Sequence, residues 1–573
     1  MAGPPDSQAR VSLCIGLTAH RDLLPDQEPQ LRQDVRAFLQ DLRTRFPDLP
    51  LRLISALAEG GDQLVAEEAL ALGLELVAPL PMPQSEYERD FADDVALLRF
   101  RALLARAQVR VLPLAPGLRP GDIAQPGPAR DRQYAQLGMF ISSHCQVLLA
   151  LWDGRASQAT GGTAQVVEYH LRNIMPSVDP SQVAPNLLAD DESDLVYHLP
   201  CARASDPRPP TDTQSRWLTL AGSQAVGPGL PGQYGQVFAQ MQAFNRDAAR
   251  YATNTASERL FDAALPGPVP AASAAIEGLF RAADALALHF QRRVRNSLLC
   301  THVLAALMGL SFILYTDVGA NRVFVLAFLL LFGLGLLLTL LGRRREWQRK
   351  YLDYRGLAEG LRVQLFWRLA GVGPPPDSSL GYDSFLQKQD VELSWIRHAM
   401  RGTGLLREED LPADADWLAW VIRHWIGDAQ GLGGQLEYYR RGTLRRERAY
   451  RWTTRLGDTA LAGGLVGALV LLVGDPERVA RMQQPLLLAM GLLPLLAGIR
   501  EAYSFKKADK ELIKQFRFMT RMFESCRERL RLARNDAQAR TLLLALGRAC
   551  LEEHAEWILL HRERPLEHGS LSG

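Results

Sequence analysis

The sequence carries almost no net charge of either sign. Its 573 residues include 65 Lys and Arg against 63 Asp and Glu, which leaves a formal net charge of +2. Proteins dedicated to nucleic acid carry a strongly basic face or segment, because they must neutralise a phosphate backbone. We therefore do not expect nucleic acid as a partner. The chain also exceeds the usual size of one domain, so several units with separate cores are expected.

Cysteine pairs and hydrolase signatures are also missing. The six cysteines form no CxxC pair and have no neighbouring histidine at metal-ligand spacing. We interpret them as small buried hydrophobic residues in a reducing cytosol, and we expect no metal or cofactor. A Walker-type GxxxxGK[ST] and an HExxH are absent, which argues against nucleoside triphosphate hydrolysis and zinc proteolysis. The cysteines are Cys14, Cys145, Cys201, Cys300, Cys526 and Cys550.

The N-terminus lacks the features of a cleaved signal peptide. The opening MAGPPDSQARVSLCIGLT has no basic region followed by a long apolar region. We expect residues 1–10 to form a tail and the domain that follows to stay in the cytosol.

Long apolar runs, in contrast, are present in two pairs. They cover residues 298–315 and 323–341, then 459–474 and 485–499. A bilayer core of about 30 Å is crossed by roughly 17 to 25 apolar helical residues. The first pair contains no Asp, Glu, Lys or Arg, whereas the second pair is shorter and richer in glycine, so buried soluble helices stay an alternative there. The runs predict four transmembrane helices in two hairpins.

Flanking charge predicts the orientation of both hairpins. QRRVRN precedes the first pair and GRRREWQRK follows it, while the turn TDVGAN lacks Lys and Arg. RWTTR and IREAYSFKK flank the second pair, although its expected outer loop, DPERVARMQQ, holds Arg478 and Arg481. Because basic residues stay on the cytoplasmic side, we expect a multi-pass protein with both termini in the cytoplasm.

The runs contain few polar side chains. None of these is an acid or a Lys or Arg, so a selectivity filter built from rings of charge is not expected. We interpret His302, near the cytosolic end of its run, as an interfacial residue. Small residues recur at four-residue spacing, as at Ala305 and Gly309 or Gly463 and Gly467, which suits close packing either within one subunit or between copies. The polar residues are Thr301, His302, Ser311, Thr339 and Thr459.

Helical periodicity dominates the rest of the second half. From Ser273 the apolar spacing is helical and leads straight into the first run, and amphipathic helices are expected after each pair. The recurrence suggests an internal duplication, with one module at 274–410, a second at 411–566 and a tail at 567–573.

Before residue 260 the pattern is that of an α/β domain. Residues 11–260 alternate short apolar strands with helices, interrupted by a Pro- and Asp-rich insertion at 176–215 in which LVYHLP could return a strand to the sheet. A first strand, Val11 to Ile15, is expected to end at Gly16. Further strands are expected to end at Ser55, before AEGGD, and at Trp152, before a loop that leads to GGT.

These three loops carry the candidate ligand residues. Glycines let the backbone approach a phosphate, and free N–H groups at a helix N-terminus attract negative charge. Open α/β sheets bind ligands at the carboxyl ends of their strands. The alternatives are that His20 and Arg21 cap the sheet edge, that Glu59 and Asp62 cap a helix rather than bind ribose hydroxyls, and that Gly-Gly-Thr is an ordinary turn. The candidates are Gly16, Thr18, His20, Arg21, Glu59, Gly60, Asp62, Gly161, Gly162 and Thr163.

The motif series GLTAHRDL, AEGGD, PMPQSEYERDF and GGTAQVVEY resembles that of SLOG domains, which are Rossmann-like nucleotide-binding modules. The resemblance implies that the domain binds a nucleotide or nucleotide-derived ligand. The chain has Ala19 where such domains often have glycine. Enzymatic relatives that cleave nucleoside 5′-monophosphates show PGGxGT before a catalytic glutamate, whereas this chain has GGTAQVVE. We therefore expect binding rather than hydrolysis, with Glu168 on a helix surface.

The helical modules, including YLDYRGLAEGLRVQLFWRLAGV and LGRACLEEHAEWILLHRERP, resemble the SLATT domain over about residues 282–566. SLATT is a two-helix membrane module found beside nucleotide sensors in bacterial conflict systems. The resemblance implies an inner-membrane antiviral effector that senses a nucleotide, assembles as a homo-oligomer and perturbs the bilayer or forms a pore.

Two other functions are consistent with the same residues. One is a membrane-anchored enzyme of the nucleoside-monophosphate phosphoribohydrolase type, in which Glu59 or Glu168 assists the chemistry. The other is a scaffold that gathers partners through its long helices and binds no ligand.

Overall fold

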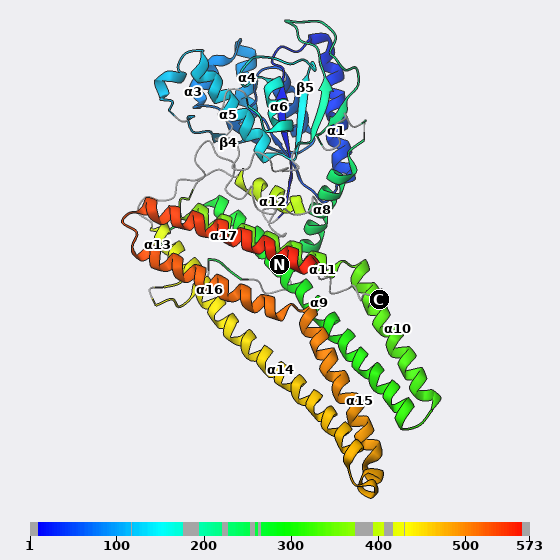
Figure 1. The fold of residues 1–573 in the computed structure, drawn as a ribbon. Helices are drawn as coiled ribbons and strands as arrows, with labels where there is room; N and C mark the ends of the chain where they lie inside the picture. The colour runs from blue at the N-terminus through cyan, green and yellow to red at the C-terminus, as the bar shows by residue number, and fades with distance from the viewer. Residues whose placement is uncertain are drawn as a thin grey trace, which may run out of the picture. The chain divides into compact units, whose positions relative to one another are not determined.

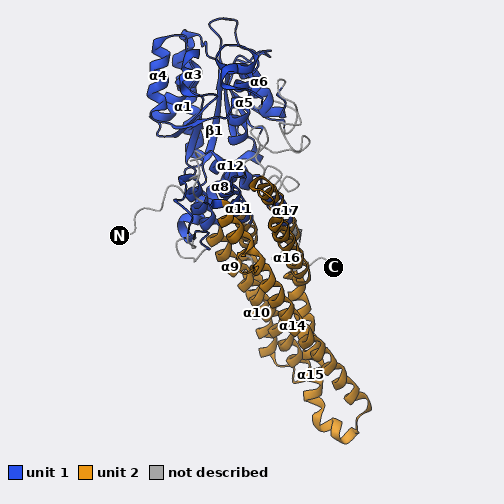
Figure 2. Cartoon of the chain, turned by 90° about the vertical axis from the view of Figure 1, so that its left-hand side faces the viewer, with its two compact units in different colours: residues 1–283, 356–417, 547–555 blue, residues 284–355, 418–546, 556–573 orange. Residues whose placement is uncertain are grey.

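The computed structural model describes most of the chain in two compact units (Figure 2). Unit 1 comprises residues 1–283, 356–417 and 547–555, and unit 2 comprises residues 284–355, 418–546 and 556–573. Both expected tails, apart from residue 10, lie outside the described residues, as does part of the expected insertion. The described residues are 10–115, 117–175, 194–220, 227, 229–252, 258–261, 265–372, 393–405, 416–428 and 430–563.

Unit 1 is built on a seven-stranded sheet with the order β4-β3-β2-β1-β5-β6-β7. Neighbouring strands are parallel except for β6 and β7, which are antiparallel. The predicted α/β class is confirmed, and LVYHLP does return a strand, β6, to the sheet. The strands are β1 (Leu13–Ala19), β2 (Leu51–Ile54), β3 (Glu75–Leu80), β4 (Gln108–Val111), β5 (Val147–Trp152), β6 (Val196–Pro200) and β7 (Arg216–Leu218).

Helices cover both faces of this sheet (Figure 1). On one face α5 and α6 pack on a cluster that includes Cys14, Leu148 and Val196. Side chains alternate between faces along a strand, and Tyr197, next to Val196, accordingly stacks on Phe38 of α1 with ring centroids 4.2 Å apart. On that side α1, α2 and α4 form a row. The helices are α1 (Glu28–Arg45), α2 (Gly61–Ala71), α4 (Asp94–Leu104), α5 (Pro128–His144) and α6 (Thr163–Arg172).

Shorter helices occupy the loops of the sheet. A 3-10 turn, η2 (Pro25–Gln27), precedes α1, and α3 (Gln84–Tyr87) with η3 (Glu88–Asp90) follows β3. Another 3-10 turn, η4 (Pro120–Ile123), leads toward α5.

Two helices from later in the chain pack in unit 1 beside the sheet. They are α8 (Gly232–Tyr251) and α12 (Ser394–Gly404). Asn245 of α8 exchanges two hydrogen bonds of 2.9 Å with the backbone of Val11. Carbonyl groups at the end of α12 accept hydrogen bonds from Arg52 and Arg110, the latter at 2.7 Å. Thus α12, which our sequence division placed in the first membrane module, packs in the same unit as the sheet.

Four helices are long and apolar enough to cross a bilayer. Their most apolar segments have mean hydropathies of 2.0, 2.8, 1.9 and 1.5. Large apolar side chains on them face outward, such as Leu330 at 65% exposure and Leu472 at 80%. A soluble protein rarely leaves such continuous apolar surface in water, so the chain belongs to the multi-pass membrane class. The helices are α9 (Ala271–Asp317), α10 (Arg322–Arg344), α14 (Gly434–Val473) and α15 (Pro476–Lys506).

These helices extend well beyond the apolar runs. The predicted helix from Ser273 into the first run is confirmed, since α9 is continuous to Asp317. The prediction that DPERVARMQQ forms a loop is wrong, because all of this segment after Asp475 is helical. Asp475 caps α15 by accepting a hydrogen bond of 3.1 Å from the backbone N–H of Glu477, and Pro476 starts the helix. Polar composition suggested a loop, but Asp followed by Pro is a strong helix-start signal.

Of the recurring small residues, Gly309, Gly463 and Gly467 contact other helices of the chain, whereas Ala305 is exposed. A Cβ added at Gly309 of α9 would lie 2.3 Å from Leu495 of α15, and one at Gly464 of α14 would lie 2.8 Å from Pro494. Helices without side chains at such points can approach closely. His302 donates a hydrogen bond from Nδ1 to the Leu298 carbonyl at 2.8 Å, within α9.

A helix follows each pair of apolar segments, as predicted. The expected amphipathic pattern holds for α16 but is wrong for α11 (Trp347–Leu369), in which no residue is exposed. In α16 the buried residues Leu512, Phe516, Met519 and Phe523 recur every three or four positions.

The cysteines were expected to be buried. Four of the six are buried, Cys550 is partly exposed, and Cys300, which lies on α9, is exposed, so the expectation is wrong for Cys300. The remaining helices are α11 (Trp347–Leu369), α13 (Trp417–Val421), the π-helix η7 (Ile422–Ile426), α16 (Asp509–Arg531) and α17 (Asp536–Glu563).

Candidate functional site

The strand order reverses direction between β1 and β5. From β1 the chain builds outward to β2, β3 and β4, and then returns to place β5 on the other side of β1. Ligands of open α/β sheets bind at such a switch point, outside the carboxyl ends of the strands. The loops after β2, β1 and β5 are neighbours there, and these are the three loops in which the sequence placed its candidate residues.

The loop after β1 starts later than expected. The strand does not end at Ile15 but continues to Ala19, so Gly16 and Thr18 lie inside the sheet. A Cβ at Gly16 would lie 2.7 Å from the Cys145 Sγ of α5. Gly16 therefore allows α5 to pack closely on the sheet, and the loop itself begins with His20 and Arg21.

The loop after β2 lies directly against the loop after β1. Gly60 has a φ of 80°, and a Cβ there would be 2.0 Å from the carbonyl oxygen of Arg21. The N–H of Gly61 donates a hydrogen bond of 3.1 Å to the carbonyl of His20. A left-handed glycine without a side chain is thus required at this contact.

Asp62 holds the loop after β2 together. Its side chain is buried at the start of α2, and it accepts a hydrogen bond of 3.0 Å from the Ser55 hydroxyl. Burial raises the pKa of this carboxyl to about 7, although the Ser55 hydrogen bond and the charge of Arg21 oppose the rise. Asp62 therefore organises the loop before α2, whose N-cap is Gly60 and has no side-chain capping hydrogen bond. Glu59 accepts a hydrogen bond of 3.3 Å from the N–H of Ala92.

Arg21 is an exposed cation without a carboxylate partner among the described residues. Its guanidinium lies over the ring of Tyr134 in α5, 5.3 Å from the centroid. The Tyr134 hydroxyl donates to Asp90, which Arg130 holds at 2.7 Å. Because Asp90 is engaged by Arg130 and Tyr134, the N–H groups of Arg21 stay available for an anion.

The loop after β5 meets the same tyrosine. Gly161 has a φ of 72°, and a Cβ there would lie 2.8 Å from the Tyr134 Cβ. Gly162 is the N-cap of α6 and Thr163 is its first residue. The N–H groups of Thr163 and Ala164 have no acceptor among the described residues, as is normal in the first turn of a helix. Arg21 and a helix N-terminus thus both adjoin Tyr134.

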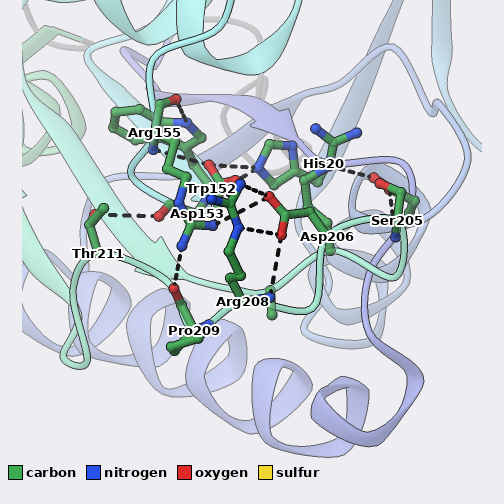
Figure 3. Close-up of polar contacts among 12 residues, drawn as sticks. His20, Trp152, Asp153, Arg155, Ser205, Asp206, Arg208, Pro209 and Thr211 are labelled. Carbon is green, nitrogen blue, oxygen red and sulfur yellow. Dashed lines mark hydrogen bonds and ion pairs between the residues drawn. The ribbon is translucent and has the colours of Figure 1, made fainter.

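His20 faces the end of β5 (Figure 3). Its Nε2 accepts a hydrogen bond of 3.1 Å from the backbone N–H of Asp153 and lies 3.3 Å from Asp153 Oδ1. A nitrogen that accepts an N–H carries no proton, so we assign a neutral ring rather than an ion pair. Burial lowers the pKa of His20, which agrees with this assignment, while the charge of Asp153 opposes the effect.

The other cations beside His20 are compensated (Figure 3). Arg155 lies 3.8 Å from Asp206, which also pairs with Arg208, and Arg203 lies 3.0 Å from Asp22. These pairs stiffen the loops beside β5. Among the described residues of this crevice, Arg21 is a cation that can receive a charged ligand without losing an ion pair.

Sequence reasoning missed three residues of this arrangement. Asp153 follows β5 directly, so its position at a strand end was a usable signal. Asp90 lies within the motif PMPQSEYERDF but was not predicted as a site residue. Tyr134 lies within α5, and no local pattern distinguishes it. Glu168 is on the surface of α6 as expected, where it pairs with Arg172 at 3.2 Å.

Compared with models of protein families and with curated proteins, the chain matches none.

Proposed function

We propose that unit 1 binds a nucleotide at the crevice between the loops after β1 and β5, and that binding controls the membrane helices. The observation that carries this proposal is the exposed guanidinium of Arg21, which has no ion pair within the described part of the chain and lies over Tyr134, the residue that also adjoins the loop before α6. Guanidinium groups bind phosphate through two parallel hydrogen bonds, and helix N-termini attract the same charge. The switch-point position and the resemblance to SLOG domains favour a nucleotide over other phosphate esters.

The direct test uses the full-length protein in detergent and a panel of nucleoside phosphates, cyclic nucleotides and dinucleotides. Arg21→Gln should weaken binding of the responding compound about 10- to 100-fold, since hydrogen bonds to charged groups contribute about 1.5 to 3 kcal/mol. Arg45→Gln, which removes an exposed arginine paired with Asp41 on α1, is the matched control and should bind normally. Equal binding by both variants would remove the phosphate site from this crevice.

For the membrane part we propose two hairpins, α9 with α10 and α14 with α15, whose basic ends face the cytoplasm. A reporter fusion tests this orientation. Alkaline phosphatase fused after Asn321, between α9 and α10, should be active, and green fluorescent protein fused after Glu563 should fluoresce. The opposite pattern would reverse the topology.

The proposed response is a shift of a homo-oligomer toward a membrane-perturbing state, which serves as an antiviral defence at the inner membrane. A ligand shifts such an equilibrium only by its difference in affinity for the two states. The helix α9 is a covalent route for this coupling, because it runs from Ala271 to Asp317 and contains residues of both units. Ion flux through proteoliposomes should depend on the nucleotide. Absence of flux despite measured binding would defeat the effector proposal.

A further inference from the structure

Unit 2 contains a basic cavity that the nucleotide proposal does not use. The cavity has a volume of about 340 Å³ and lies among α14, α15 and the start of α16. This size is within the range of small-ligand sites. Its wall holds four cations and a single carboxylate, Asp509. The four cations are Arg445, Arg446, Arg500 and Lys507.

Two of these cations have no counter-ion among the residues that the structure describes. Arg445 and Arg446 form no ion pair there, and the guanidinium of Arg446 instead lies 4.4 Å from the centroid of the Phe516 ring. A guanidinium stacked on a ring keeps its N–H edge free for an acceptor. The excess of positive charge at the cavity wall is therefore not neutralised by the protein.

Arg500 is fixed by its neighbours. Its guanidinium lies 5.4 Å from the centroid of the Tyr450 ring and donates to the Thr454 hydroxyl at 2.6 Å. One Nη of Arg500 forms an ion pair with the Glu501 carboxylate at 2.5 Å. The Nε of Arg500 is buried and has no acceptor within the described ranges. This N–H is shielded from solvent by its neighbours, so Arg500, which lines the cavity, acts on an anion there through its positive charge.

The cavity lies beside the ends of the apolar runs of α14 and α15. The apolar run of α15 ends at Ile499, so Arg500 is the first residue beyond it. Thr453, which also lines the cavity, precedes the run of α14 by about 9 Å at 1.5 Å of helical rise per residue. Tyr450 and Tyr503 add the aromatic side chains typical of a membrane interface.

We propose that this cavity binds the phosphate ester of an anionic phospholipid headgroup. Basic pockets between membrane helices on the cytoplasmic side bind such headgroups through charge and hydrogen bonds. Arg446 and Arg500 hold the phosphate oxygens, and Tyr450 packs beside the headgroup. The inference requires α14 and α15 to lie in the membrane, but it does not depend on nucleotide binding in unit 1.

The test is lipid binding to the full-length protein, measured by native mass spectrometry from a neutral detergent. Phosphatidylglycerol should bind the wild-type protein in preference to phosphatidylcholine, a comparison that needs no variant. Arg446→Gln and Arg500→Gln should each weaken phosphatidylglycerol binding about tenfold, as expected for one charge-assisted contact. Arg451→Gln is the matched control, because Arg451 is an exposed arginine of the same helix that does not line the cavity.

Three results would overturn the proposal. The first is equal retention of the two lipids by the wild-type protein, and the second is an equal loss of binding in the Arg451→Gln control. The third is binding of soluble glycerol 3-phosphate as tightly as phosphatidylglycerol, which would assign the cavity to a free phosphate ester. Arg21→Gln should leave lipid binding unchanged, so failure of this inference and failure of the nucleotide proposal give different results.

Discussion

Replacement of Asp62 by asparagine tests the structure of the crevice through its pH dependence. Burial raises the pKa of this carboxyl from 3.8 to about 7. The folded state therefore holds a proton that the unfolded state releases, and its stabilising effect is complete below pH 3.8 and lost as the pH rises through 7. Between pH 6 and pH 8 the free energy of unfolding should fall by about 1.4 kcal/mol through this group.

The Asp62→Asn variant has no charge to titrate at this position. Asparagine keeps the shape and one acceptor for the Ser55 hydroxyl, so its stability should not change with pH through this group. Burial lowers the pKa of His144 to about 3 and also lowers that of His198, so in the folded state these histidines lose their protons at lower pH than in the unfolded chain. They act equally in both proteins and cancel when wild type and variant are compared at each pH.

Hydrogen–deuterium exchange of the α2 amides measures this difference in the full-length protein. The ratio of wild-type to variant protection should fall about tenfold between pH 6 and pH 8, which is the equivalent of about 1.4 kcal/mol. A ratio that stays constant over this window would show that Asp62 is ionised or solvated throughout, and the described packing of the loop after β2 would be refuted.

Two glycine pairs give further predictions. Gly60→Ala should lower the melting temperature of unit 1 more than Gly73→Ala. Both glycines have φ near 80°, but only at Gly60 would a Cβ clash with a backbone carbonyl. Equal shifts in melting temperature would contradict the contact between the two loops. Gly464→Ala should destabilise the packing of α14 on α15, with a cost of about 1 to 3 kcal/mol for overpacking, because its Cβ would lie 2.8 Å from Pro494. Gly333→Ala, which meets nothing within 4 Å, should be neutral, and thermal unfolding in detergent separates the two.

Strong local patterns predicted the classes of structure. The apolar runs identified the four membrane helices, since spanning a bilayer requires length and apolarity that few other structures need. Alternating strands and helices identified the α/β unit, and a strand that ends in a polar loop marked the candidate site residues. His20, Arg21, Gly60 and Gly161 all lie in the loops that meet at the switch point.

The exact ends of strands and helices, and the residues that pack against them, could not be predicted from local sequence patterns. Gly16 suggested the end of a strand, but β1 continues to Ala19 through its pairing with β5, and the glycine leaves room for Ile141 and Cys145 at the end of α5. The start of α15 at Pro476 was hidden by polar residues that the sequence associates with a loop. In both cases packing or capping outweighed composition.

The sequence by itself determined the membrane helices, the α/β class and the three glycine-containing loops, because each depends on residues that are close along the chain. Only the tertiary structure decided that Arg21 lies on Tyr134 with no ion pair among the described residues, that His20 meets Asp153, and that cations of α14 and α15 line one cavity. These arrangements join residues far apart in the chain, and the free energy that fixes them comes from the packing of whole helices and sheets.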